Sequence, residues 1–150
     1  MAFFECTFFS RVLAFDTNVC VYIPTPDADE TTAGTDRYFR KGVQFQTLYL
    51  LHGAFGDCTD WIRQTCIERY AWRRRLAVVM PSTYNSFYQN MYRGSEYLRY
   101  CSEELPDLVR SVFPLSPKRE DTFAADLSMG GYGALRIAFE RPDVFCAGGV

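Results

Sequence analysis

The chain has 150 residues, of which 48% are hydrophobic and 17% aromatic, and its formal net charge is −2. This length and apolar content suit one globular domain with a hydrophobic core, and no apolar run approaches the ~18 residues of a membrane-spanning helix. The charge argues against nucleic acid as a partner, and six cysteines without a C-x-x-C pair argue against a zinc motif.

The first 24 residues predict two strands. Residues 3–9 are rich in aromatic side chains, and residues 18–23 alternate between apolar and polar positions. Residues 1–9 lack the basic start and the small-residue cleavage site of a signal peptide. We therefore expect a cytoplasmic protein with free thiols.

The polar segment 27–42 raises the question of calcium, because Asp27 and Asp29 are spaced like ligands in an EF-hand loop. Such a loop needs a glycine where Thr32 stands and a final glutamate where Tyr38 stands. The segment is therefore interpreted as a solvated turn, and no metal is expected.

Strands and helices alternate over the rest of the chain. Short apolar runs bounded by turn residues predict buried strands, and apolar residues every three or four positions predict helices. The predicted strands are 45–51, 76–80, 122–127 and 144–150, and the predicted helices are 60–72, 96–113 and 129–140. Pro106 should kink the second helix or begin a new first turn. This order predicts an α/β fold, a mostly parallel sheet flanked by helices with antiparallel N-terminal strands.

The junction between the strand 122–127 and the helix 129–140 carries the strongest functional signal. Ser128 stands there between Asp126 and Gly130, at the kind of strand-to-helix turn that exposes a catalytic serine. The usual first glycine of this motif is replaced by Asp126. A serine at this place is also a common helix N-cap, which is the alternative interpretation.

A second loop follows the strand 45–51 and consists of His52, Gly53, Ala54, Phe55 and Gly56. Its glycines would let the backbone approach a substrate, and we expect the Ala54 and Met129 N–H groups to form an oxyanion hole, with the Phe55 N–H as the alternative donor. His52 is the only histidine. A catalytic base follows the serine in the expected chain order, so we assign His52 to support of the loop instead.

Five segments together resemble the esterase D branch of the α/β-hydrolases, which includes tributyrin esterases, S-formylglutathione hydrolases and acetyl-xylan esterases. They are Leu50–Gly53, Asn85–Tyr88, Ser102–Pro106, Lys118–Asp121 and Leu127–Gly133. The resemblance implies an incomplete α/β-hydrolase core. It also implies hydrolysis of small, short-chain acyl esters through an acyl-enzyme on Ser128, without a cofactor. It also implies that the acyl pocket is bordered by Asn85, Ser86, Phe87 and Tyr88.

Two features depart from this family. The first is Asp126, which brings a carboxylate to the crowded base of the turn. The second is that residues 1–150 lack the acid and the histidine that follow on later strands in this family. We therefore expect residues 1–150 to be the N-terminal portion of a single hydrolase domain, inactive alone and prone to associate, as a homo-oligomer or otherwise, through an exposed sheet edge. Two further hypotheses are a catalytically inactive binding or decayed fragment and an acyltransferase of the same fold.

Overall fold

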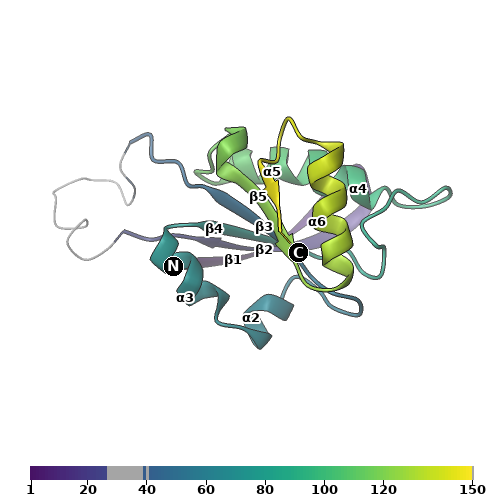
Figure 1. Cartoon of the computed structure of the whole chain (residues 1–150), viewed down its shortest axis with the longest axis horizontal. Helices are drawn as coiled ribbons and strands as arrows, with labels where there is room; N and C mark the ends of the chain where they lie inside the picture. The colour runs from purple at the N-terminus through teal and green to yellow at the C-terminus, as the bar shows by residue number, and fades with distance from the viewer. Residues whose placement is uncertain (27–38, 40, 150) are drawn as a thin grey trace.

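The computed structural model describes residues 1–26, 39 and 41–149, and it contains a six-stranded sheet in the order β1-β2-β4-β3-β5-β6 (Figure 1). The strands are β1 Ala2–Ser10, β2 Phe15–Ile23, β3 Thr47–Leu51, β4 Ala77–Pro81, β5 Thr122–Asp126 and β6 Ala147–Gly148. β2 pairs antiparallel with β1 and β4, and the other neighbours pair in parallel. The predicted fold class is confirmed. The segment considered for calcium, with Asp27 and Asp29, lies outside the described residues.

Helices cover the two faces of this sheet (Figure 1). One face carries α2 (Asp60–Gln64) and α3 (Ile67–Arg74). The other carries α4 (Tyr97–Arg99), the π-helical turn η1 (Tyr100–Glu104), α5 (Leu105–Val112) and α6 (Met129–Glu140), and the 3₁₀ turn η2 (Arg119–Asp121) leads into β5. No helix among the described residues has the length and apolar character needed to cross a membrane.

The central strand β4 is buried along its whole length. Its successive side chains point to opposite faces, so Val78 belongs to the cluster under α2 and α3 whereas Val79 belongs to the cluster under α5 and α6. This double burial explains why the sequence there is a continuous apolar run rather than an alternating one.

The prediction of one continuous helix over 60–72 is wrong, because the structure divides this segment into α2 and α3. Thr65 interrupts it with an extended backbone, φ −140° and ψ 176°. Its Oγ1 accepts a hydrogen bond from the Ile67 N–H at 3.1 Å and so replaces a helical bond at the start of α3. Threonine competes well for such local bonds, which the apolar spacing alone does not reveal.

Three other boundaries differ from the predictions. The helix predicted over 96–113 follows one path but changes to π-helical geometry in η1, just ahead of Pro106 near the start of α5. Phe45 lies outside β3 because its N–H donates to the Pro114 carbonyl at 2.9 Å. The strand predicted over 144–150 is confined to Ala147–Gly148, since Val144 still belongs to a turn bonded to Arg141.

Candidate active site

Two loops meet where β3 and β5 end. These strands are parallel neighbours with their last residues paired, so the segments that follow them begin side by side. A Cβ built on Gly53 would lie 3.4 Å from the Leu127 carbonyl oxygen and 3.6 Å from Ser128 Cβ. The loop 52–56 and the turn at Ser128 are therefore in close contact, although they are far apart in the sequence.

Ser128 is exposed and occupies an unusual backbone conformation, φ 60° and ψ −114°. A non-glycine residue in such a sparsely populated region carries a strain of about 1–3 kcal/mol. The residue stands at the N-cap position of α6, yet its side chain makes no capping hydrogen bond. Because Ser128 is exposed and its hydroxyl does not cap α6, the N-cap role considered from the sequence does not account for this residue.

Gly130 allows the start of α6 to approach β3 and β5. A Cβ at this position would lie 2.8 Å from the Leu51 carbonyl oxygen, 2.9 Å from Asp126 Cβ and 3.0 Å from the His52 carbonyl oxygen. Two of these atoms are backbone atoms of the sheet and its following loop, which have little room to move. A side chain here would push α6, and with it Ser128, away from the loop 52–56.

The backbone N–H groups around Ser128 differ in their availability. The Phe55 N–H donates to Asn85 Oδ1 at 2.7 Å, which removes it from the set of free donors. Within the described part of the chain, no hydrogen bond uses the N–H of Ala54 or of Met129. Of the donors considered from the sequence, Ala54 and Met129 are thus the two that remain open, and Phe55 is the one that is occupied.

His52 lies 1% exposed under this loop with both ring nitrogens engaged. Its Nε2 accepts a hydrogen bond from the Thr83 N–H at 3.0 Å, so the ring proton is on Nδ1, which donates to the Gly53 carbonyl at 2.7 Å. The ring thus joins the end of β4 to the loop after β3. Thr83 was not among the residues predicted from the sequence, although its place as a polar residue just after a buried strand was the available signal.

The segment Asn85–Tyr88, expected to border an acyl pocket, makes hydrogen bonds to the loop 52–56 and within itself. Asn85 binds the loop as described above, and Ser86 Oγ accepts the Tyr88 N–H at 3.1 Å. The Tyr88 hydroxyl donates to the His52 carbonyl at 2.9 Å, and its ring fills the space that a Cβ on Gly133 would need. Only Phe87 has a largely exposed side chain of apolar character in this segment. The other three residues hold the loop in place.

Asp126 is half-buried at the end of β5. Its Oδ2 is buried and has no hydrogen-bond partner in the described part of the chain. Desolvation by this burial raises the pKa of the carboxyl above its usual value. The departure noted in the sequence therefore brings a carboxylate into the turn, and its buried oxygen finds no compensating partner among the described residues.

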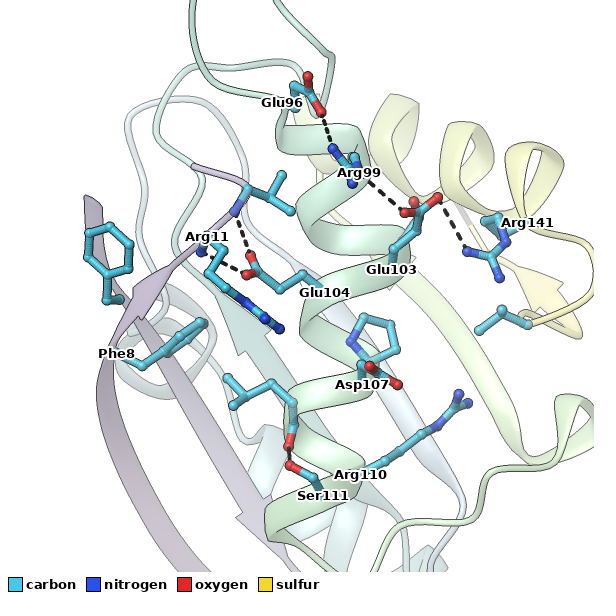
Figure 2. Close-up of a pocket in the computed structure, with 16 residues that line it drawn as sticks. Phe8, Arg11, Glu96, Arg99, Glu103, Glu104, Asp107, Arg110, Ser111 and Arg141 are labelled. Atoms are coloured by element: carbon cyan, nitrogen blue, oxygen red, sulfur yellow. Dashed lines mark hydrogen bonds and ion pairs between the residues drawn. The ribbon is translucent and has the colours of Figure 1, made fainter. Parts of the chain in front are cut away.

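A surface cleft of about 960 Å³ lies away from these loops, between β1, the α4-η1-α5 path and the end of α6 (Figure 2). Its charged side chains largely neutralise one another: Arg99 contacts Glu96 and Glu103, and Glu103 contacts Arg141. Glu104 accepts the Arg11 N–H at 2.8 Å and so fastens the turn between β1 and β2. None of the site residues named above lines this cleft, and the described residues offer no cluster that could hold a metal ion.

A family model, a curated relative and two solved structures all match this chain and agree on one class of protein. The family model described as "Putative esterase" matches residues 28–148. An acetyl esterase of Caldicellulosiruptor saccharolyticus is 39% identical over 140 residues, which are 91% of this chain and 50% of the relative.

Two solved structures from Staphylococcus aureus are each 37% identical. One, described as fluorophosphonate-binding serine hydrolase F, superposes with a TM-score of 0.84 over 97% of this chain and 55% of its own. The other, an S-formylglutathione hydrolase, has a TM-score of 0.81 over 99% of this chain and 57% of its own. The chain spans about half the length of these relatives.

Proposed function

Because the chain belongs to the esterase family, we propose that it carries the nucleophile and the oxyanion hole of a serine carboxylesterase acting on short-chain acyl esters. The names of its relatives, acetyl esterase and serine hydrolase, support this reaction class. The observation that carries the proposal is the strained, exposed Ser128 in contact with a loop that has a free N–H group.

In this proposal Ser128 Oγ gives its proton to a base as it attacks the carbonyl carbon of the ester. The base passes that proton to the alcohol, which leaves as the acyl-enzyme forms. The carbonyl oxygen becomes negatively charged in the tetrahedral intermediate, where the N–H groups of Ala54 and Met129 stabilise it. Gly53 lets the first donor approach the serine, and Gly130 brings the second close by packing α6 against the sheet. Water then gives a proton to the base as it attacks the acyl carbon, the bond from this carbon to Oγ breaks, and the carboxylic acid leaves. The base returns the proton to Ser128 Oγ.

The base must come from outside residues 1–150. The only histidine is His52, and both of its nitrogens are used under the loop. We therefore infer that these residues form the N-terminal portion of the hydrolase domain and that the acid and the base are supplied by further sequence, as the double length of the relatives suggests. Loss of an entire triad partner lowers kcat about 10⁴- to 10⁶-fold, so the chain alone should turn over p-nitrophenyl acetate very slowly.

The test is acetylation of Ser128 by p-nitrophenyl acetate with imidazole supplied as an external base. Imidazole hydrolyses this ester by itself, so each rate is compared with that of Ser128→Ala at the same imidazole concentration. The native chain should release p-nitrophenolate faster than this variant, and peptide mapping by mass spectrometry should find the acetyl group on Ser128.

Ser111→Ala is the matched control, because Ser111 is an exposed serine on α5 outside the site. This variant should behave like the native chain. Equal rates for the native chain and Ser128→Ala, or acetylation spread over several serines, would contradict the proposed nucleophile. A native chain that reaches the turnover of an intact esterase without imidazole would contradict the need for an external base.

A further inference from the structure

The thiols of Cys20 and Cys58 are in direct contact. Their Sγ atoms are 3.3 Å apart, and the side chains are 0% and 4% exposed. Cys20 comes from β2, and Cys58 follows the loop 52–56 by two residues, ahead of α2. The fold thus brings together two thiols that are 38 positions apart in the sequence.

No other thiol–thiol hydrogen bond is found among the six cysteines, all of which lie in the described residues. Cys6 lies opposite Val19, the residue before Cys20, and its side chain packs in the cluster on the other face of the sheet from Cys20. Cys101 is buried in that opposite cluster as well, and Cys66 is exposed. A reaction that joins thiols within the folded chain therefore has one available pair.

The two sulfur atoms are also placed in unequal electrostatic surroundings. The Cys20 thiol donates its hydrogen bond to the sulfur of Cys58, and the Ser82 side chain bonds the same sulfur, which lowers the pKa of Cys58 despite burial and the nearby carboxylates of Asp57 and Glu5. The pKa of Cys20 is raised by the same contact. Cys58 is therefore the nucleophile of the pair, since the thiolate is the reactive form.

From this geometry we propose that Cys20 and Cys58 form a reversible disulfide when the folded chain meets hydrogen peroxide. The Cys58 thiolate attacks one peroxide oxygen and becomes a sulfenic acid, while the other oxygen leaves as hydroxide and takes up a proton to form water. The sulfur of Cys20 then attacks the sulfenic sulfur, and a second water leaves. In total two thiols lose two electrons and two protons, and one peroxide becomes two waters.

The bond needs little movement. The sulfur atoms must approach by about 1.3 Å to reach the usual S–S length of ~2.05 Å. The Cys58 N–H already donates to Ser82 Oγ at 3.1 Å, and Thr83, the next residue, holds His52. The disulfide would thus join β2 covalently to the segment that leaves the proposed oxyanion loop. The thiol chemistry itself does not depend on the proposed esterase function.

The experiment treats the full chain with hydrogen peroxide, blocks the remaining thiols with iodoacetamide and digests with trypsin without reductant. Cys20, Cys58 and Cys66 fall in separate tryptic peptides, 12–37, 42–63 and 64–69. The expected product is peptide 12–37 joined to 42–63, which dithiothreitol separates. It should form at least about tenfold faster in the folded chain than in the same chain unfolded in urea, because folding holds the thiols together.

Cys66→Ser removes the exposed thiol and should leave this product unchanged, whereas Cys20→Ser and Cys58→Ser should abolish it. Tryptic mapping of the oxidised native chain tests the Cys20–Cys58 disulfide even where a variant folds poorly. Peroxide products that join Cys66 or Cys146 as readily, or a Cys20 and Cys58 that both stay open to iodoacetamide after unfolding, would overturn the proposal. None of these readouts involves Ser128, so failure here leaves the esterase proposal standing.

Discussion

Replacing Asp126 with alanine should stabilise the folded chain. Asp126 Oδ2 is buried and has no hydrogen-bond partner among the residues that the structure describes, although the carboxyl would be fully hydrated in the unfolded chain. The substitution keeps Cβ, which lies 2.9 Å from where a Cβ on Gly130 would stand, and removes only the carboxyl group. The folded state thus loses a desolvation penalty while its packing is kept.

The size of the effect follows from how much of the carboxyl is buried. A buried polar group without a partner costs about 1–3 kcal/mol. Asp126 is half-buried and only its Oδ2 is buried without a partner among the described residues, so we take the lower end, a gain of about 1 kcal/mol. For a chain of this size that corresponds to a rise in Tm of about 2–4 °C.

The gain should depend on pH with a defined sign. The pKa of Asp126 is raised on folding, so the folded chain binds this proton more tightly than the unfolded chain, whose aspartate pKa is about 3.9. The native chain therefore loses stability as pH rises through the window between these two values. The advantage of Asp126→Ala should be full at neutral pH and should shrink as pH falls toward about 4.

Urea unfolding at pH 7 and pH 4, followed by the fluorescence of Trp61 and Trp72, measures both effects. Asp16→Ala is the matched control, because Asp16 is an exposed aspartate on β2. The control should not reproduce the gain. An Asp126→Ala variant that unfolds at lower urea than the native chain at pH 7 would refute the reasoning, and an equal gain at both pH values would refute its electrostatic part.

Three other substitutions test the site. Gly130→Ala should cost about 1–3 kcal/mol in urea unfolding, because its Cβ would meet two backbone oxygens, whereas Gly149→Ala, with its nearest contact at 3.9 Å, should cost little. Tyr88→Phe should cost about 1–2 kcal/mol by the same measurement, since it leaves the buried His52 carbonyl without its hydroxyl partner. Asn85→Ala removes the hydrogen bond that holds the Phe55 N–H and thus the loop 52–56. Because this loop carries the proposed Ala54 donor, the variant should lower the imidazole-dependent acetylation of Ser128 more than it lowers stability. A drop in stability with unchanged acetylation would show that Asn85 has only a structural role.

Much of the fold could be predicted because it is encoded in local patterns. Continuous apolar runs such as 76–80 marked strands buried on both faces, and the strand-helix alternation implied the parallel sheet. The family was predicted from short motifs and is confirmed by the family match and the relatives. The boundaries failed where a side chain or a distant segment competed with the pattern, as at Thr65 and Phe45.

For the candidate site, too, some features follow from local sequence and others from contacts between distant segments. The sequence by itself determined the serine, the two glycine-containing loops and the presence of a single histidine, because these depend on residue type and spacing. Only the tertiary structure decided that the Phe55 N–H is occupied, that both nitrogens of His52 are engaged and that two cysteines touch. Each of these depends on a partner from another segment of the chain, and which segments meet is set by strand order and register rather than by local sequence.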